Sequence, residues 1–250
     1  MDKLLRNKIT LITGCDQGIG RSICHLFADQ GAVVYANLLK EESAEGLKED
    51  CDTLEGKVIP VVFDITDKSA VMDHIKKIKM EQGGRLDVLV NNAGVKFDGV
   101  IEMIDDNKLE KMLSVNIVGT IYMVQSALRL MKRNPNGGSI INVSSIVGLR
   151  GNVGQSVYGA TKGAVASLTR SWAKEFARQN IRVNAVAPGS IDTNMFYEMS
   201  ADKICESIEA IGLKRLGRPE EVAKVVLFLA SEMASYVTGE IIGIDGGLFM

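Results

Sequence analysis

Apolar residues gather in short continuous runs, and these runs alternate with longer segments in which apolar residues recur every three or four positions. The continuous runs predict strands that are buried on both faces, and the wider spacing predicts amphipathic helices. The predicted strands are Lys8–Thr13, Ala32–Asn37, Lys57–Phe63, Leu86–Val90, Ser139–Val143, Ile181–Val186 and Glu240–Ile244. The predicted helices are Arg21–Gln30, Glu41–Cys51, Lys68–Gln82, Asp105–Arg133 (one helix or two), Gln155–Gln179 and a helix that opens at Pro219.

This alternation of strands and helices predicts the α/β fold class. We expect a single Rossmann-type, doubly wound domain over residues 1–250, with about seven parallel strands and helices on both faces. No internal repeat, low-complexity tract or Pro/Ser-rich linker interrupts the pattern.

The composition narrows the classes of function. Lys and Arg (29) nearly balance Asp and Glu (31), so the formal charge of −2 gives no reason to expect nucleic acid or a membrane surface as a partner. No apolar run is long enough to span a bilayer, and the first residues do not resemble a signal peptide. Four cysteines without C-x-x-C spacing and two histidines make a metal site improbable and predict reduced thiols in a cytoplasmic protein.

A glycine-rich segment joins the first predicted strand to the first predicted helix. It reads Thr13-Gly14-Cys15-Asp16-Gln17-Gly18-Ile19-Gly20. Glycines allow the backbone to approach a pyrophosphate closely, and a helix N-terminus offers free N–H groups. A purely structural turn would also be rich in glycine, but the position after the first strand of a βαβ series favours dinucleotide binding.

Two further polar stretches follow predicted strands. Asp64 follows the third strand, where its carboxylate either accepts a hydrogen bond from adenine or caps the next helix. Asn91-Asn92-Ala93-Gly94 follows the fourth strand, and ligands of open α/β sheets bind beyond such strand ends. The alternative for both stretches is an ordinary polar turn.

The segment from Ser139 to Gly163 carries the candidate chemistry. Ser144 and Ser145 end a predicted strand, and Tyr158 and Lys162 lie four residues apart on a predicted helix, so they share one face. Taken alone, such a tyrosine and lysine are more often a surface pair. Behind a dinucleotide turn and a serine, they predict a proton-transfer site.

With TGCDQGIG, NNAG, Asn116, Ser145 and Tyr158-x-x-x-Lys162 in this order, the chain resembles the short-chain dehydrogenase/reductase family over essentially its whole length. The runs GLRGNVGQSVYGATKGAV and VTGEIIGIDGGLFM look most similar to the 3-oxoacyl-[acyl-carrier-protein] reductases, although sugar, polyol and steroid dehydrogenases share much of the pattern. The resemblance implies an NAD(P)-dependent enzyme that interconverts a ketone and a secondary alcohol. The expected substrate is a 3-oxoacyl thioester, and a sugar, polyol or cyclic alcohol is the alternative.

The resemblance also implies a role for each catalytic residue. Tyr158 gives its phenolic proton to the carbonyl oxygen, Ser145 rather than Ser144 orients that carbonyl, and Asn116 anchors a water that relays protons. Lys162 holds the nicotinamide ribose, and its charge, together with that of the oxidised nicotinamide, is expected to lower the pKa of the phenol. The residues expected to contact the cofactor are Gly14, Asp16, Gln17, Gly18, Ile19, Gly20, Asn37, Leu38, Asp64, Ile65, Asn91, Ala93, Gly94, Tyr158, Lys162, Pro188, Gly189, Ile191 and Thr193.

The choice between NAD and NADP rests on two departures from the family pattern. NADP-preferring members commonly carry a basic residue just before Gly18, where this chain has Asp16 and Gln17. NAD-preferring members usually carry an aspartate at the end of the second strand, where this chain has Asn37 and Leu38. Lys40 either reaches a 2′-phosphate or is a solvated charge at the start of a helix. We expect NAD, because a carboxylate that faces a phosphate costs more than a missing diol acceptor.

Substrate and partner residues follow from the same resemblance. Ser190–Lys214 lies where a substrate lid belongs, and its residues Met195, Phe196, Tyr197 and Met199 either cover an apolar chain or pack a connecting helix. Basic residues near the entrance are candidates for an acyl-carrier protein: Arg129, Lys132, Arg133 and Arg178. Asn136 and Gln179 fall near positions where that subfamily carries carrier-binding arginines, which counts against a carrier. Related enzymes are commonly homotetramers.

Two other classes of protein compete with this interpretation. A serine hydrolase of the α/β class needs a G-x-S-x-G segment and a histidine after the serine, whereas both histidines of this chain precede residue 75. A dinucleotide sensor without catalysis would be expected to have lost part of the set Asn116, Ser145, Tyr158 and Lys162, and none is lost.

Overall fold

The strands form one parallel sheet. A computed structural model of the chain describes residues 3–197 and 201–248. The strands are β1 (Ile9–Ile12), β2 (Val33–Leu38), β3 (Lys57–Val62), β4 (Val88–Asn91), β5 (Gly138–Val143), β6 (Ile181–Pro188) and β7 (Ile241–Ile244). All neighbours pair in parallel, in the order β3-β2-β1-β4-β5-β6-β7, which confirms the predicted fold class.

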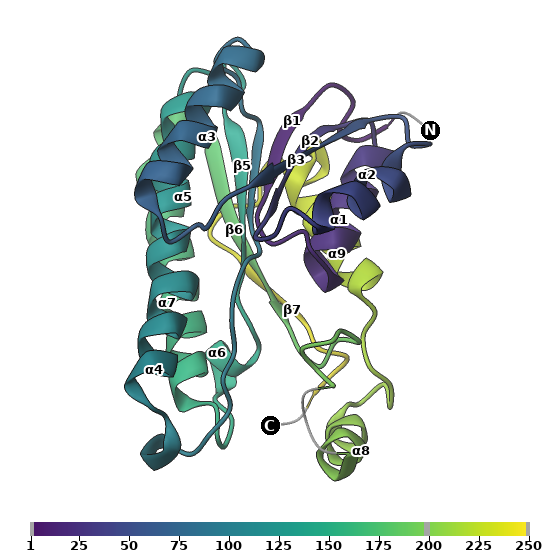
Figure 1. The fold of residues 1–250 in the computed structure, drawn as a ribbon, viewed down its shortest axis with the longest axis vertical. Coiled ribbons are helices and arrows are strands. Elements are labelled where there is room, and N and C mark those ends of the chain that lie inside the picture. Colours follow the sequence, from purple (N-terminus) through teal and green to yellow (C-terminus); the bar gives the residue numbers. More distant parts are fainter. Residues whose placement is uncertain (1–2, 198–200, 249–250) are drawn as a thin grey trace.

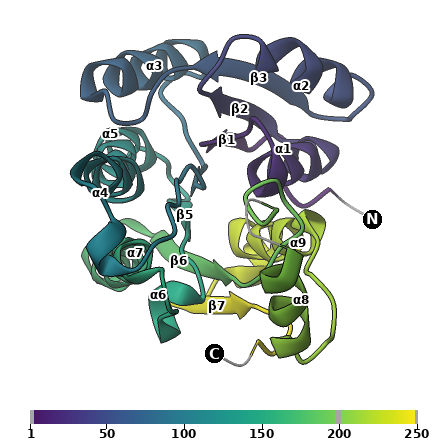
Figure 2. The same ribbon diagram turned by 60° about the horizontal axis from the view of Figure 1, so that its bottom comes forward.

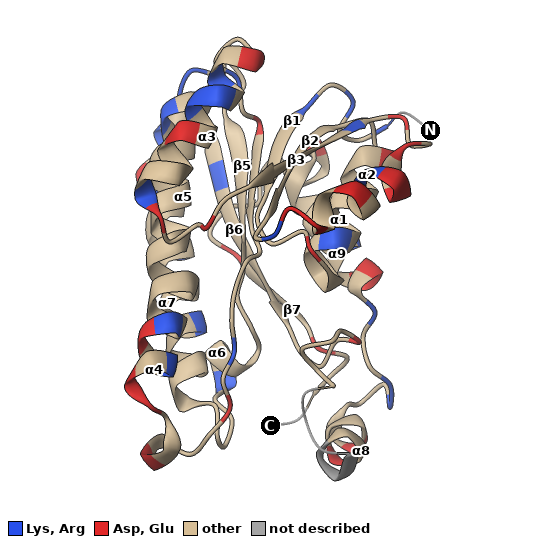
Figure 3. Cartoon of the chain, in the orientation of Figure 1, with Lys and Arg blue, Asp and Glu red and all other residues tan. Residues whose placement is uncertain are grey.

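Helices cover both faces of this sheet (Figures 1 and 2). The longer ones are α1 (Gly18–Asp29), α2 (Ser43–Cys51), α3 (Lys68–Glu81), α5 (Thr120–Met131), α7 (Ser156–Phe176), α8 (Ala201–Ala210) and α9 (Pro219–Ala230). Helices α1, α2 and α9 pack on one face, and α3, α5 and α7 pack on the other. Figure 3 shows charged residues mainly on helices and loops, and the strands contain only two of them, Lys57 in β3 and Arg182 in β6.

A hydrophobic core lies on each side of the sheet. One core contains Phe27 of α1 and Val226 of α9, and the other contains Ile75 of α3 and Trp172 of α7. Both faces of the central strands, such as β1 and β4, are thus removed from water, which explains why these strands are continuous apolar runs in the sequence. The chain order reverses beside β1, which lies between β2 and β4, and this reversal opens a crevice at the carboxyl ends of the strands.

Three helical segments replace the helix or helices predicted over Asp105–Arg133. They are α4 (Asp106–Leu113), a π-helical segment η2 (Ser114–Gly119) and α5. The wider turn of a π-helix often marks a functional site, and Asn116 lies in this one. Apolar spacing alone could not reveal it, since a π-turn shifts the helical period by only one residue.

Other element bounds also differ from the prediction. Helix α1 begins at Gly18, three residues before Arg21, because glycines at its start leave no apolar pattern to detect. The structure adds the short helix α6 (Val147–Arg150), the helix α8 and the 3-10 turns η1 (Ile101–Met103), η3 (Ala177–Gln179) and η4 (Glu232–Ala234).

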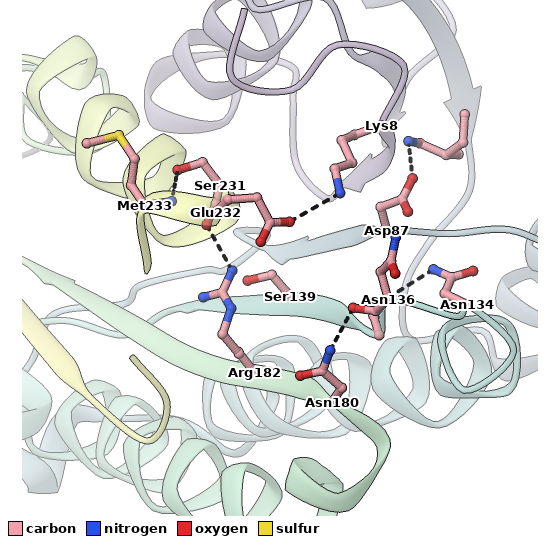
Figure 4. A network of polar contacts seen from close by, with 12 residues as sticks. Lys8, Asp87, Asn134, Asn136, Ser139, Asn180, Arg182, Ser231, Glu232 and Met233 are labelled. Carbon is pink, nitrogen blue, oxygen red and sulfur yellow. Dashed lines mark hydrogen bonds and ion pairs between the residues drawn. The ribbon is translucent and has the colours of Figure 1, made fainter. Parts of the chain in front are cut away.

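Polar contacts tie the elements together at the amino ends of the strands (Figure 4). The buried Asp87 accepts a hydrogen bond from the backbone N–H of Ile9 at 2.7 Å and one from Arg85 Nε at 2.9 Å. Arg182 donates to the carbonyls of Leu229 and Ser231 at the end of α9, at 2.8 and 3.2 Å. A basic side chain at a helix C-terminus satisfies carbonyls that have no partner within the helix.

Replacement of Asp87 by alanine should destabilise the protein. The change leaves the buried N–H of Ile9 without its acceptor, at an expected cost of about 2–3 kcal/mol in the free energy of unfolding. Urea denaturation measures this loss, and Asp73→Ala on the exposed surface of α3 is the matched control, with a change below about 0.5 kcal/mol. Equal stability of the two variants would contradict the role assigned to Asp87.

Candidate active site

A cleft of about 680 Å³ opens at the carboxyl ends of the strands. Most of the residues predicted to bind the cofactor or to act in catalysis line it. These residues are Gly14, Asp16, Gln17, Gly18, Ile19, Gly20, Asn37, Asp64, Ile65, Ala93, Gly94, Ser145, Tyr158, Lys162, Pro188, Gly189, Ile191 and Thr193. Three predicted residues do not line it, namely Leu38, Asn91 and Asn116.

The glycine-rich turn has a backbone that side chains would block. Gly14 and Gly18 have positive φ angles of 69° and 56°. A Cβ added at Gly20 would lie 2.0 Å from the carbonyl oxygen of Gly14, so only glycine fits there. No side chain caps the start of α1, which leaves its first N–H groups free to face the cleft. This bare, positively polarised helix end fits the pyrophosphate of a dinucleotide.

Two asparagine side chains hold this turn in place. Asn37 Oδ1 accepts a hydrogen bond from the N–H of Gly14, and Asn37 Nδ2 donates to the carbonyls of Leu38 and Phe63. Asn92 Nδ2 donates to the carbonyls of Thr13 and Gly14, both at 2.9 Å. The sequence predicts a cofactor contact for Asn37 but none for Asn92. Both are polar side chains at strand ends, and both line the cleft and hold the turn.

The end of β2 differs from the prediction. Leu38 is fully buried in the core, and the neighbouring Leu39 lines the cleft with 59% of its surface exposed. Strand alternation turns consecutive side chains to opposite faces, so a prediction that is one residue out selects the wrong side chain. Asp16 Oδ2 accepts a hydrogen bond from the N–H of Leu39 at 3.3 Å. A carboxylate therefore lies at the end of β2, although it comes from the glycine-rich turn.

Asp64 lies in the cleft and does not cap a helix. Its Oδ1 accepts hydrogen bonds from the N–H and the hydroxyl of Thr66 at 2.8 and 2.7 Å. Burial alone would raise the pKa of Asp64, but the bonds from Thr66 and the charge of Lys111 hold that pKa below its usual value. The cap of α3 is Asp67, which accepts from the N–H groups of Ser69 and Ala70.

Asn91 belongs to the interior and not to the cleft. Its Nδ2 donates to Asn142 Oδ1 at 2.8 Å, and Asn142 Nδ2 donates to the hydroxyl of Thr169 at 2.9 Å. This chain of bonds links β4 to β5 and α7 inside the fold. Asn91 Oδ1 is buried without a hydrogen-bond partner among the described residues. The predicted contact between Asn91 and the cofactor is therefore not supported by its position.

Ser145, Tyr158 and Lys162 meet in the cleft beside the end of β5. The two adjacent serines differ, because the Ser144 hydroxyl donates to the carbonyl of Lys162 at 2.8 Å, whereas the Ser145 hydroxyl accepts from the N–H of Val147 at 3.2 Å and lowers the pKa of the Tyr158 phenol. Lys162 is buried, and its Nζ donates to the carbonyl of Val143 at 2.8 Å. Lys162 Nζ also lies 5.9 Å from the centre of the Tyr158 ring.

Burial dominates the electrostatics of this group. Burial raises the pKa of the Tyr158 phenol to about 12. The Asp98 carboxylate also raises this pKa, whereas the Ser145 hydroxyl lowers it. Burial also lowers the pKa of Lys162 to about 8. The charge of Lys162 is not among the causes of the shift at Tyr158, and the lowering expected from Lys162 together with an oxidised nicotinamide stays a prediction for the cofactor-bound enzyme.

Asn116 lies behind the cleft wall. Its Nδ2 donates to the carbonyl of Val95 and to Thr161 Oγ1 at 2.9 and 3.0 Å, and its Oδ1 accepts from the N–H of Val95 at 2.8 Å. A Cβ added at Gly94 would lie 3.2 Å from both Asn116 Oδ1 and Lys162 Nζ. The asparagine and the lysine thus lie close to the same glycine, and the water relay through them stays a prediction.

Apolar side chains form the remaining wall. Met195, Phe196 and Leu248 line the cleft, together with Ile146 and Val147. Tyr197 is 55% exposed and does not line it, and Met199 lies outside the described residues. The predicted lid segment thus contributes two of its four singled-out residues to an apolar surface beside the reacting groups.

The basic residues predicted near the entrance lie elsewhere. Helix α7 starts at the cleft and runs for 21 residues, about 30 Å, before it reaches Arg178 in η3. Arg133 follows the end of α5 and lies at the same amino edge of the sheet. Within one chain these arginines are therefore remote from the cleft, because helices of a parallel α/β fold run opposite to the strands.

Residues 3–197 and 201–248 contain neither a cluster of metal ligands nor a membrane-spanning helix. No three side chains of His, Cys, Asp or Glu come close enough together there to hold a metal ion. None of the helices in that part of the chain combines the length and apolar character needed to cross a membrane.

Comparison with known proteins identifies the family. The family described as "Enoyl-(Acyl carrier protein) reductase" matches residues 14–249. The 3-oxoacyl-[acyl-carrier-protein] reductase FabG of Thermotoga maritima is 44% identical over 98% of this chain and 98% of its own length. The proteins of the same name from Aquifex aeolicus and Chlamydia muridarum are 40% and 38% identical, and the alignments cover 99% or more of each chain. The chain belongs to the short-chain dehydrogenase/reductase family.

Membership of the short-chain dehydrogenase/reductase family makes the chain an NAD(P)-dependent oxidoreductase with a nicotinamide dinucleotide as cofactor. The cleft suits that cofactor, because the close contact at Gly20 and the uncapped start of α1 leave space and N–H groups for a pyrophosphate.

Proposed function

We propose that this enzyme reduces 3-oxoacyl thioesters to 3-hydroxyacyl thioesters, and that the chain forms one domain that carries both cofactor and substrate sites. The proximity of Ser145, Tyr158 and Lys162 in a cleft with an apolar wall carries the proposal. The relatives at 38–44% identity are named for this reaction on acyl-carrier-protein substrates. The family description names enoyl reduction, but two hydroxyl groups side by side suit a ketone oxygen.

The residues of the chain handle the carbonyl group and its proton. When bound, the reduced nicotinamide supplies the hydride. The Ser145 hydroxyl donates a hydrogen bond to the substrate's carbonyl oxygen, and the Tyr158 hydroxyl transfers its proton to that oxygen as negative charge develops on it. A phenol with a pKa of about 12 is fully protonated at neutral pH, so it is ready to act as the acid. Lys162, fixed by the carbonyl of Val143, holds the ribose.

The apolar wall gives the acyl chain a place. Met195, Phe196 and Leu248 come from the segment after β6 and from the C-terminal segment, and they face the same cleft as Tyr158. An acyl chain that packs against them loses contact with water, at about 25 cal/mol for each Å² of apolar surface buried. A sugar or polyol would leave this surface without a partner, which makes it the weaker alternative.

NAD is the cofactor that the end of β2 favours. The Asp16 carboxylate, bonded to the N–H of Leu39, lies where the ribose of the adenosine half is expected. A carboxylate there accepts hydrogen bonds from a ribose diol and repels a 2′-phosphate. Asp16 thus supplies the acceptor that residue 37 lacks, since the Asn37 side chain is used on Gly14, Leu38 and Phe63.

An acyl-carrier protein remains the proposed donor of the substrate, and a homotetramer the proposed assembly. Arg133 and Arg178 contribute to carrier docking only if a second chain brings the far ends of its α5 and α7 to the cleft of the first. Carrier docking at these two arginines therefore requires the proposed assembly.

Tyr158→Phe should abolish turnover and leave cofactor binding intact, because the variant lacks the proton donor but keeps the ring. Initial rates with acetoacetyl-CoA, a matching enoyl-CoA, a cyclic ketone and a keto-sugar test the reaction and the substrate class together. The oxoacyl thioester should give the highest kcat/KM. A variant as active as the parent, or a higher kcat/KM with any other substrate, would refute the proposal.

Cofactor preference should follow the charge of residue 16. The parent enzyme should have the higher kcat/KM with NADH, and Asp16→Asn should raise kcat/KM for NADPH by about tenfold, as expected for removal of one like-charge contact near the surface. Glu49→Gln on the exposed side of α2 is the charge-matched control and should change neither value. A strong preference of the parent for NADPH would contradict this prediction.

Charge reversal at the far ends of α5 and α7 tests the carrier. Arg133→Glu and Arg178→Glu should raise KM for an acyl-carrier substrate by about tenfold and leave KM for the same acyl-CoA unchanged, because only the acidic carrier meets this surface. Lys48→Glu on α2 provides the control reversal, and sedimentation reports the assembly. An unaltered KM for the carrier substrate in a tetrameric enzyme would rule out this docking surface.

A further inference from the structure

A charged segment passes from the NNAG stretch to the start of the helix that carries Tyr158. In it, Lys96 Nζ lies 3.2 Å from Asp98 Oδ2. The Lys96 side chain is only 10% exposed and lines the cleft, whereas that of Asp98 is 39% exposed. A largely buried ammonium needs a partner, and Asp98 provides it.

The other carboxylate oxygen of Asp98 is bonded to α7. Gln155 Nε2 donates to Asp98 Oδ1 at 2.9 Å, and Gln155 Oε1 accepts from Asn152 Nδ2 at 2.9 Å. Gln155 occupies the residue before the first turn of α7, yet its side chain makes no capping bond to that helix. Instead, the side chain bonds to Asp98, which lies 57 residues earlier in the sequence.

The backbone strengthens the same contact. The N–H of Gly99 donates to the carbonyl of Gly154 at 2.8 Å, directly beside the bond between Asp98 and Gln155. Tyr158 follows Gln155 by three residues, so it lies within the first turn of the helix that this contact anchors. A displacement of the helix start would move the phenol relative to Ser145, which comes from a different element.

We propose that Asp98 is a positioning residue for Tyr158, because its carboxylate fixes the first turn of α7 through Gln155 and holds the Lys96 ammonium in the cleft wall. This inference rests on the proposed function, in which Tyr158 is the proton donor. Asp98 touches neither substrate nor cofactor in this role. It acts through the placement of the helix and through the negative charge that it adds beside the phenol.

The cleft that Tyr158 lines also contains charged side chains of other segments. Lys162 lies on α7 itself, Asp98 and Lys96 form a pair on the segment after β4, and Lys111 of α4 lines the cleft 3.9 Å from Asp64. Of the carboxylates, Asp98 is the one that raises the pKa of Tyr158, in addition to the larger effect of burial. Removal of its charge should therefore lower the pKa of the phenol.

Two variants separate the charge from the bond. Asp98→Asn keeps an oxygen that accepts from Gln155 but removes the charge, so in the direction of alcohol oxidation the rise of kcat with pH should shift to lower pH. Gln155→Ala keeps the charge but breaks the bond, so kcat should fall by about tenfold without a shift in the pH profile. Glu102→Gln, on the exposed turn η1, is the charge-matched control and should alter neither quantity.

A double-mutant cycle tests whether the two residues act through one contact. Asp98→Ala and Gln155→Ala break the same bond, so the double variant should lose no more kcat than the more impaired single variant. Each rate is measured with 3-hydroxybutyryl-CoA and NAD⁺ on protein shown to be folded by its thermal unfolding. An unshifted pH profile in Asp98→Asn, or losses of kcat that multiply in the double variant, would overturn the proposal.

The Tyr158→Phe variant separates failure of this inference from failure of the proposed function. If Tyr158→Phe retains turnover, the proposed function itself fails. If Tyr158→Phe is inactive while the Asp98 and Gln155 variants behave like the parent, only the positioning role fails.

Discussion

The close approach of residue 20 to the carbonyl oxygen of Gly14 is the constraint on which the cleft depends. At a distance of 2.0 Å from the position of a Cβ atom, no side chain fits between the turn and the first helix. The same turn comes within 2.9 Å of Ala93 at the end of β4, measured from the Cβ position of Gly14. The ends of β1, β2 and β4 thus lie in close contact through their backbones. The side-chain amides of Asn37 and Asn92 bond to backbone groups of Thr13 and Gly14 that no regular strand or helix satisfies.

Burial shapes the reacting groups as strongly as it shapes the turn. Tyr158 and Lys162 are neighbours on one helix, and desolvation moves both toward their uncharged forms, the phenol upward to about 12 and the amine downward to about 8. A low-dielectric site strengthens polar contacts, so a single hydrogen bond such as that from Lys162 Nζ to the carbonyl of Val143 contributes more to the placement of the side chain.

Sequence patterns predicted the fold well because burial on both faces of the sheet produces continuous apolar runs, and each run became a strand. They predicted the glycine-rich turn because positive φ angles and close approach require a specific residue type. They failed where the answer depends on the direction of a side chain: Leu38 and Asn91 point into the interior, although each adjoins a residue that lines the cleft. The contact of Asp98 with Gln155 joins distant segments and leaves no spacing to detect.

The position of Asn37 has a consequence for the redesign of cofactor preference. Engineers who alter this preference in related folds would first consider an acid at the end of β2. In this chain, an aspartate at position 37 would place a buried charge against the carbonyl oxygens of Leu38 and Phe63, which now accept from the Asn37 amide. The glycine-rich turn, which Asn37 holds in place, would be destabilised before cofactor selectivity changed. Residues 16 and 39 contact each other at the surface of the cleft, so they can be substituted for such a design without disturbing the bonds of Asn37.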